Sequence, residues 1–141
     1  MIVLVEDNAN DEELMLRAFR KSDVELRVVI LRDGAEALDY FFTRGAYAGR
    51  SQVELAQVVL LDLKLPKVNG LEVLRQLRDD DRTRLLPIVI LTSSAEDQDV
   101  LRCYGLGANS YVRKPVDFTQ FVEVVRQLCR YWLMINQTAP G

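Results

Sequence analysis

Short apolar runs alternate along the chain with segments in which apolar residues recur every three or four positions. The runs at 2–5, 24–31, 58–61 and 88–91 each have the length of a strand, a short fifth strand is expected at 111–112, and helical periodicity follows each one. Strands that alternate with helices in this way form parallel sheets whose two faces are both covered by helices. The pattern therefore predicts an α/β protein with a five-stranded parallel sheet and helices on both faces.

Polar residues indicate where some of the predicted helices begin. Asn10 is a candidate N-cap of the first helix. Ser94, with Asp97 three residues later, resembles a capping box at the start of the fourth. The second helix is expected at about 35–44, where apolar residues follow the helical period.

The chain has the size of one domain. With 141 residues, of which 49% are apolar, it can bury one full core but hardly two. We expect a single domain over 1–141, with a loop at 46–56 and a flexible tail at 136–141. The longest apolar runs are far shorter than the roughly 20 residues of a membrane span, and the N-terminus has no signal-peptide pattern. A cytoplasmic protein without a membrane partner is therefore expected.

Charge and cysteine content bear on whether the protein binds nucleic acid, forms a disulfide or holds a metal ion. Signs are well mixed in a chain of net charge -3, so no basic patch for nucleic acid is expected. Cys103 and Cys129 lie far apart without a metal-binding spacing, which favours buried reduced thiols over a disulfide. The acidic run at 79–81 lacks the closing Glu of a calcium loop, which favours a solvated helix end over a metal site.

The chain contains no histidine. This absence excludes Ser/His/Asp and Cys/His catalytic arrangements, zinc sites with histidine ligands, and a phosphohistidine relay within the polypeptide. Any chemistry must therefore use carboxylates, hydroxyl groups and lysine.

The polar residues of most chemical interest stand where predicted strands end. They are Glu6 and Asp7 after the first strand, Asp62 after the third, Thr92 after the fourth and Lys114 after the fifth. The carboxyl ends of parallel strands meet at one edge of the sheet, where ligands bind in such folds. Three carboxylates repel one another unless a hard cation lies among them, and Mg²⁺ (or Mn²⁺) prefers oxygen ligands. A lysine in the same place suits a phosphoryl group.

Four motifs at these positions carry a family resemblance. VEDN, LLDLKLP, ILTSS and YVRKP match, in order, the motifs of the receiver domains of two-component response regulators. The stretch before LLDLKLP is long for such a domain, which predicts an insertion at 46–56. Together with the LPKVNG turn, this insertion resembles the stand-alone response regulators that serve bacterial and cyanobacterial phytochromes.

The resemblance implies a flavodoxin-like fold and a signalling switch. Asp62 is the implied phosphoacceptor, which takes a phosphoryl group from the phosphohistidine of a sensor histidine kinase, with a phytochrome as the suggested kinase. Because each molecule accepts one phosphoryl group, the protein is expected to be no enzyme. It would nevertheless promote its own metal-dependent phosphorylation and dephosphorylation.

The resemblance also assigns the metal ligands. Asp7 and Asp62 would bind Mg²⁺ directly, whereas Glu6 would act through water or more loosely. The backbone carbonyl of Lys64 would supply a further ligand.

Lys114, Thr92 and Tyr111 receive roles from the same resemblance. Lys114 would offset charge on the transferred phosphoryl oxygens, and its peptide bond to Pro115 is expected to be cis. Thr92 would move toward the phosphoryl group while Tyr111 turns inward to fill the space. An alternative for Tyr111 is an ordinary surface position on an amphipathic strand.

The protein is expected to pass on its signal by contact with another protein. No DNA-binding segment is expected after the receiver domain, so the partner would be a downstream target or a phosphotransfer protein. Apolar residues between 128 and 135 surround more of the last helix than one buried face needs. They form either a buried helix end or a surface for a homodimer or another partner.

Two other functional classes remain open. Phosphatases with an aspartyl nucleophile usually carry a second acid two residues later, and this chain has Lys64 there. The other class is a receiver-like interaction scaffold that accepts no phosphate. All five expected site residues are present, which favours the phosphorylated switch over this scaffold.

Overall fold

A parallel sheet forms the centre of the protein. The computed structural model describes residues 1–22, 24–50 and 56–140. Within these ranges the strands are β1 (Ile2–Val5), β2 (Val28–Leu31), β3 (Val58–Leu61), β4 (Ile88–Thr92) and β5 (Ser110–Arg113). Their order is β2-β1-β3-β4-β5, and all neighbouring pairs are parallel. This is the order of flavodoxin-like folds, so the predicted fold class is confirmed.

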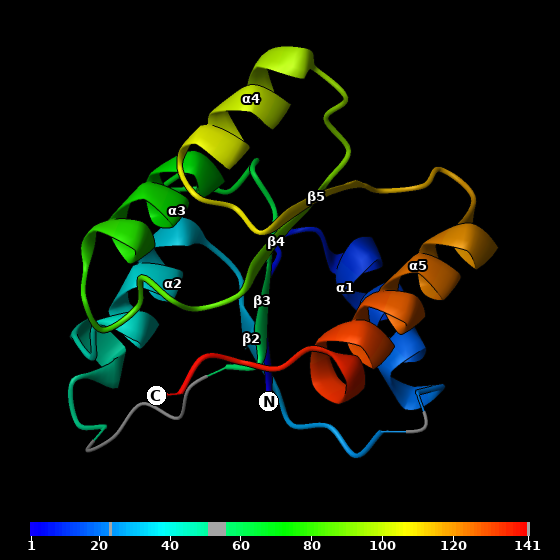
Figure 1. Ribbon diagram of the computed structural model, residues 1–141, viewed down its shortest axis with the longest axis horizontal. Coiled ribbons are helices and arrows are strands. Elements are labelled where there is room, and N and C mark those ends of the chain that lie inside the picture. Colours follow the sequence, from blue (N-terminus) through cyan, green and yellow to red (C-terminus); the bar gives the residue numbers. More distant parts are fainter. Residues whose placement is uncertain (23, 51–55, 141) are drawn as a thin grey trace.

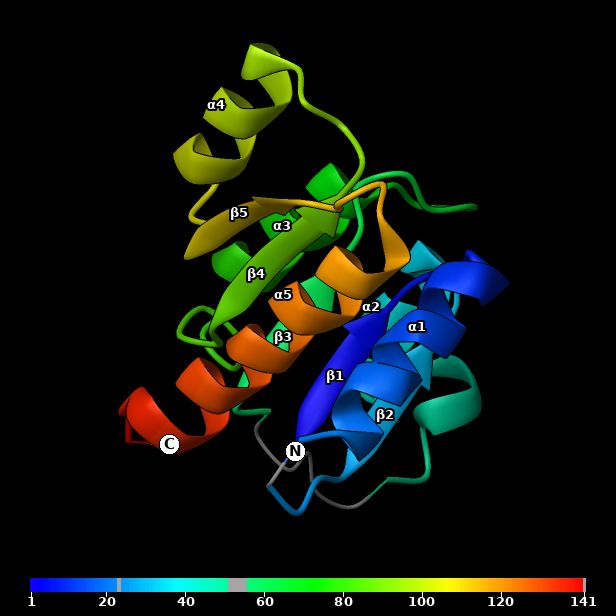
Figure 2. The same ribbon diagram turned by 90° about the vertical axis from the view of Figure 1, so that its right-hand side faces the viewer.

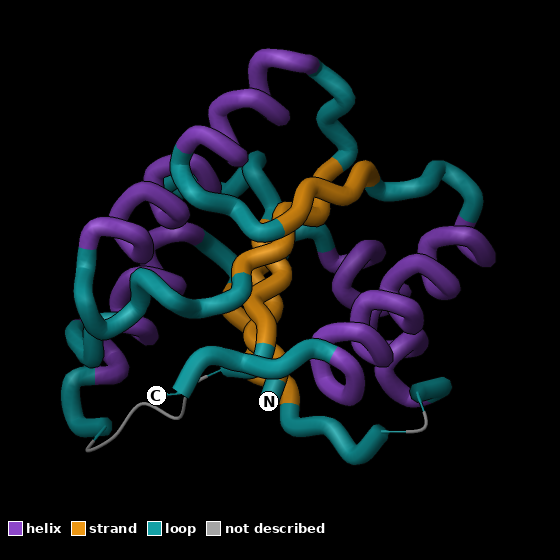
Figure 3. Tube along the Cα trace, in the orientation of Figure 1, coloured by secondary structure: helices purple, strands orange, loops and turns teal. Residues whose placement is uncertain are grey.

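Helices cover both faces of the sheet (Figures 1 and 3). One face carries α1 (Ala9–Arg20) and α5 (Phe118–Arg130), which stand in front of the strands in Figure 2. The other face carries α2 (Gly34–Phe41), α3 (Gly70–Asp79) and α4 (Asp97–Gly105). Each face has its own apolar core, so the sheet is sealed from water on both sides.

The burial of each strand follows from its place in the sheet. Every residue of β1, β3 and β4 is buried, since these strands have neighbours on both sides and helices above and below. The edge strands β2 and β5 are partly exposed. Buried strands need continuous apolar runs, so the first polar residues after them stand at the carboxyl edge of the sheet.

Two predicted element boundaries are wrong. The second strand begins at Val28 rather than at residue 24, and the second helix spans Gly34–Phe41 rather than 35–44. Residues 24–27 continue the apolar pattern, but they lie beyond the register in which β2 pairs with β1, which starts opposite Ile2. Hydrophobic pattern alone does not reveal where the neighbouring strand stops.

The predicted helix caps also need correction. Asn8 rather than Asn10 caps α1, and its side-chain oxygen accepts the N–H of Asp11 at 3.0 Å. Glu96 rather than Ser94 is the N-cap residue of α4. Several cap-forming residues stand close together at both places, and only the path of the chain decides which one has the extended backbone that a cap requires.

The predicted insertion at 46–56 begins with a short 3₁₀ turn at Gly45–Tyr47. Arg50 then packs over the Tyr40 ring, with 3.8 Å from its guanidinium carbon to the ring centre. Its Nη2 donates to the backbone carbonyl of Tyr40 at 2.6 Å. The first part of the insertion is thereby fixed to α2, and residues 51–55 lie outside the described residues.

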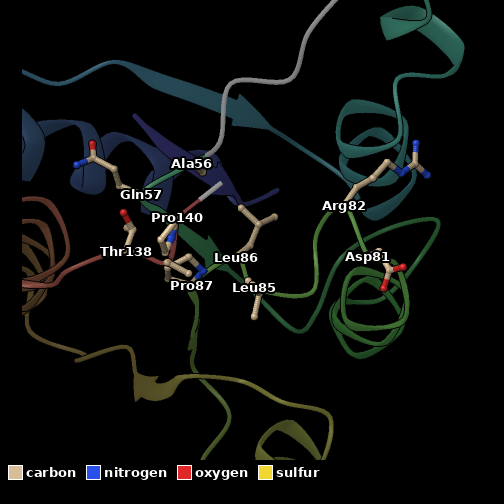
Figure 4. Close-up of a pocket in the computed structure, with 10 residues that line it drawn as sticks. Ala56, Gln57, Asp81, Arg82, Leu85, Leu86, Pro87, Thr138 and Pro140 are labelled. Carbon is tan, nitrogen blue, oxygen red and sulfur yellow. The ribbon is translucent and has the colours of Figure 1, made fainter.

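The C-terminal end turns back across the molecule. A π-helical turn at Tyr131–Ile135 continues α5, and residues 136–140 then run across the N-terminal edge of the sheet (Figure 1). Beside this segment is a cavity of about 440 Å³, lined by Thr138 and Pro140 together with Leu86 and Pro87 (Figure 4). This cavity is at the edge opposite the carboxyl ends of the strands. The expected flexibility of the tail stays a prediction.

The apolar segment after residue 128 is buried only in part, and its use as a surface for a homodimer or another partner stays a prediction. Cys129 and Trp132 are buried, whereas Tyr131, Met134 and Ile135 are exposed. Both cysteines are buried and reduced, as predicted. Among the described residues, no helix has both the length and the apolar character needed to cross a membrane.

Gly70, the first residue of α3, packs against the backbone that follows β3. A Cβ atom at this position would overlap the carbonyl oxygen of Asp62. We predict that Gly70→Ala destabilises the protein by about 1–3 kcal/mol, because the β3–α3 loop must move to make room. Urea unfolding measures the effect. Gly49→Ala is the matched control, since the added atom meets nothing within 4 Å; equal losses in both variants would contradict the prediction.

Candidate functional site

The candidate site lies at the carboxyl edge of the sheet, where the strand order reverses between β1 and β3. Glu6 and Asp7 directly follow β1, and Asp62 directly follows β3. Carboxylate oxygens of these three residues lie within 4.8 Å of one another. The sequence prediction that they converge is therefore confirmed, and the group could hold one hard cation.

The three carboxylates differ in their exposure to solvent. Glu6 is only 1% exposed and Asp62 7% exposed, whereas Asp7 is open to solvent. Burial, together with the negative charge of Asp62, raises the pKa of Glu6 to about 8. Near neutral pH the metal-free cluster therefore holds a proton on Glu6.

Lys114 joins these carboxylates from the end of β5. Its Nζ donates to Glu6 Oε1 at 2.6 Å, to Asp11 Oδ2 at 2.7 Å and to Asp62 Oδ2 at 2.9 Å. Burial alone would lower the pKa of Lys114, but the hydrogen bonds to the three carboxylates raise it above its usual value. The ammonium group is thus fully charged, with all three of its N–H donors in use.

Asp62 stays ionised despite its burial. Burial alone would raise its pKa, but the hydrogen bond and the positive charge of Lys114 outweigh burial and lower the pKa. Its other oxygen, Oδ1, accepts the backbone N–H of Lys64 at 3.3 Å. A buried, charged carboxylate of this kind is a candidate nucleophile.

Thr92 ends β4 beside this cluster. Its residue is fully buried, and its hydroxyl has no hydrogen-bond partner among the described residues. The hydroxyl still contributes, after Lys114 and Glu6, to the lowered pKa of Asp62, so it faces that carboxylate without a well-formed hydrogen bond. An unsatisfied buried hydroxyl is costly, and it is available to a group that arrives at Asp62.

Tyr111 is connected to the loop that follows Thr92. Its hydroxyl donates to the backbone carbonyl of Ser94 at 2.9 Å, and its ring packs against the core under α2 and α3. The buried Ser94 hydroxyl donates to Asp99 Oδ2, in the first turn of α4, at 2.6 Å. A hydrogen-bonded chain thus leads from β5 through the β4–α4 loop to α4.

The peptide bond between Lys114 and Pro115 is trans, since the described residues contain no cis peptide bond. The expected cis bond is therefore wrong for this structure. The trans form is favoured by about 0.5–1 kcal/mol even before proline. Lys114 reaches all three carboxylates from this backbone, so its contacts do not require the cis form.

Sequence reasoning missed two residues of this network, Asp11 and Asp99. The sequence assigned neither a place in the site, yet Asp11 contacts Lys114 and Asp99 contacts Ser94. The available signal was their place in the first turn of helices that follow β1 and β4, which directs the first turn toward the site. The metal role of the Lys64 carbonyl stays a prediction.

The pattern of the response regulator receiver domain matches residues 2–126. The chain belongs to this family. The matched part contains all five strands described above and most of α5, so this receiver domain covers the whole candidate site.

Individual relatives resemble this receiver domain over nearly its whole length. FilR2 of Methanothrix harundinacea (strain 6Ac), a probable methanogenesis regulatory protein, is 43% identical over 100% of this chain and 88% of its own. The phosphorylated cyanobacterial phytochrome response regulator RcpA is 35% identical, with a TM-score of 0.91 over 99% of this chain and 97% of its own. The Mn²⁺-bound form of the response regulator Rcp1 is 30% identical, with a TM-score of 0.91 over 99% and 98%.

The raised pKa of Glu6 predicts a pH-dependent stability. The pKa of Glu6 is about 8 in the folded protein and 4.5 ordinarily. The stabilisation that protonated Glu6 contributes is therefore fully present below pH 4.5 and is lost as the pH rises toward 8. In EDTA, we expect the free energy of unfolding of wild type to fall by about 1–3 kcal/mol between pH 6 and 9. Glu6→Gln should not show this fall. Urea unfolding at several pH values measures this. Glu13→Gln, on the exposed side of α1, is the control; parallel profiles for wild type and Glu6→Gln would refute the prediction.

The unpartnered hydroxyl of Thr92 predicts an unusual stabilising substitution. Thr92→Val keeps the shape and removes the unsatisfied group, so we expect the protein to gain about 1 kcal/mol in stability. Thr83→Val is the matched control, because the buried Thr83 hydroxyl donates to the carbonyl of Leu77 at 2.5 Å. That variant should lose stability. A loss in both, measured by urea unfolding, would show that Thr92 is satisfied in solution.

Proposed function

We propose that this protein is a single-domain response regulator that accepts a phosphoryl group on Asp62 and signals by phosphorylation-dependent protein contact. The observation that carries the proposal is the state of Asp62. It is buried, ionised and hydrogen-bonded to Lys114, and it stands beside two further carboxylates and an unpartnered hydroxyl. These are the parts that phosphoryl transfer needs.

The donor set fits a magnesium or manganese ion. Glu6, Asp7 and Asp62 offer only oxygen ligands, close enough together to share one ion. The Mn²⁺-bound form of the similar Rcp1 supports this assignment. Asp7 and Asp62 would bind the ion directly, Glu6 through water, and the Lys64 carbonyl would complete the protein ligands. The bound ion would supply charge that offsets the phosphoryl oxygens.

Each residue then has a defined part in the transfer. An Asp62 oxygen attacks phosphorus, the new O–P bond forms, and the N–P bond to the histidine of the kinase breaks. Lys114 donates to a phosphoryl oxygen and offsets its charge, and Thr92 gives that group its unpartnered hydroxyl. These 141 residues contain no histidine, so the phosphohistidine must lie outside them.

Thr92 and Tyr111 would form the switch. If Thr92 moves toward the phosphoryl group, the space it leaves and the adjacent Ser94 carbonyl favour the inward position of Tyr111. The hydrogen bond between Ser94 and Asp99 would carry this change to α4. The alternative, a plain surface role for Tyr111, is less supported because its ring packs on the core.

The proposed phosphodonor is a sensor histidine kinase, with a phytochrome as the specific suggestion. The phytochrome response regulator RcpA supports this pairing. FilR2, named for methanogenesis, shows that similar receivers occur in other regulatory settings. Downstream, we propose a protein target or a phosphotransfer protein, and a homodimer that involves the exposed Tyr131, Met134 and Ile135 at the end of α5.

The two alternative classes, a small-molecule phosphatase and a scaffold without phosphate chemistry, are less well supported than the phosphorylated switch. A small-molecule phosphatase would need a second acid two residues after Asp62, where the exposed Lys64 stands. A scaffold without phosphate chemistry would have no need of a buried ammonium held by three carboxylates. We therefore propose a stoichiometric phosphoacceptor rather than an enzyme.

The test is phosphorylation by a small-molecule donor. Wild type and Asp62→Asn are incubated with phosphoramidate, with Mg²⁺ or with EDTA, and their intact masses are compared. We expect wild type to gain one phosphoryl group only with Mg²⁺, and the variant to gain none. Asp39→Asn, a carboxylate on α2 paired with Arg44, is the control and should react like wild type. No gain in wild type would favour the scaffold.

A further inference from the structure

The ammonium group of Lys114 is held by three carboxylates that come from three different elements. Glu6 follows β1, Asp62 follows β3, and Asp11 belongs to the first turn of α1. An ammonium has three N–H donors, so none is left over. Only Asp11 lies outside the group of carboxylates that could share one cation.

Asp11 is also the partner whose chemistry stays constant during the proposed reaction. A bound cation would compete with Lys114 for the oxygens of Glu6 and Asp62, which weakens their hold on Lys114. Phosphorylation would convert Asp62 from a free carboxylate to an acyl phosphate. Asp11 undergoes neither change, and its Oδ2 lies 2.7 Å from Nζ.

The position of Asp11 is itself fixed by the start of α1. Its backbone N–H donates to Asn8 Oδ1 at 3.0 Å, and the Asn8 N–H donates to Glu6 Oε2 at 3.2 Å. At the other end, the backbone N–H of Lys114 donates to the Thr92 carbonyl at 2.7 Å. The long, flexible lysine side chain is thus held at its backbone and at its tip.

We propose that Asp11 is a positioning residue that keeps Lys114 directed at the phosphoacceptor during cation binding and phosphoryl transfer. This inference rests on the proposed function. The competing effect of Asp11 is repulsion, because its negative charge stands close to where an anionic phosphoryl group arrives. Positioning and repulsion predict opposite changes in rate when Asp11 is removed.

The experiment compares Asp11→Ala, Asp11→Asn and Glu12→Gln with wild type. Phosphorylation by phosphoramidate is followed over a range of Mg²⁺ concentrations, which separates the rate at saturating Mg²⁺ from the half-saturating concentration. Glu12 is the matched control, because it lies in the same helical turn but pairs with Arg32, at 3.0 Å.

We expect Asp11→Ala to lower the saturated rate about tenfold while the half-saturating Mg²⁺ concentration changes less than about twofold. Asp11→Asn keeps an acceptor oxygen and should fall between Asp11→Ala and wild type. Glu12→Gln should react like wild type. An equal or faster rate in Asp11→Ala would overturn the proposal, since repulsion would then be the larger effect.

A second measurement does not depend on phosphorylation. Acetylation by an amine-reactive ester, read by peptide mass, reports how well Lys114 is held, and the exposed Lys64 is the internal reference. Lys114 should react several times faster in Asp11→Ala than in wild type or Glu12→Gln. Unchanged reactivity in a folded variant would overturn the positioning role. If wild type takes up no phosphoryl group but Lys114 becomes more reactive, the proposed function fails and the positioning contact stands.

Discussion

The buried positive charge of Lys114 is the interaction on which the rest of the site depends. Charges interact more strongly in a protein interior than in water, and an unpaired buried carboxylate costs several kcal/mol. Glu6 and Asp62 are buried at the ends of strands, so they need a cation within contact distance. Lys114 supplies it at 2.6 and 2.9 Å, and the proton on Glu6 reduces the remaining negative charge. Removal of the ammonium group would leave two acids buried without a partner.

The sheet topology makes this contact possible. The strand order places β1 beside β3, which brings Glu6, Asp7 and Asp62 together, although Asp62 lies far from the other two in the sequence. β5 is two strands from β3, and only a long side chain such as that of lysine bridges this gap. Gly70 packs directly on the Asp62 backbone, so the loop that carries the proposed phosphoacceptor is fixed by contact with α3. The parallel strands thus bring polar side chains together at one edge of the sheet.

The sequence predicted the parts of this arrangement that depend on local pattern. The buried strands β1, β3 and β4 are continuous apolar runs, so the pattern of the chain placed Glu6, Asp62 and Thr92 at the strand ends. Contacts between residues that are far apart in the sequence could not be predicted from local pattern. Asp11 looked like an ordinary helix-start acid, and its contact with Lys114 spans most of the chain. Residues 24–27 looked like a strand, because nothing local shows that β1 begins only opposite Val28.

The packing of α4 explains why the switch would act through this helix. Cys103 is its one buried residue, whereas Leu101 and Tyr104 are exposed, so little apolar area holds α4 to the sheet. Elements with few buried contacts open or shift at the lowest free energy. A single charge-assisted hydrogen bond, between Ser94 and Asp99, therefore has a large share in fixing the start of α4. A change at Thr92, two residues before Ser94, would therefore act on a helix that little apolar area holds in place.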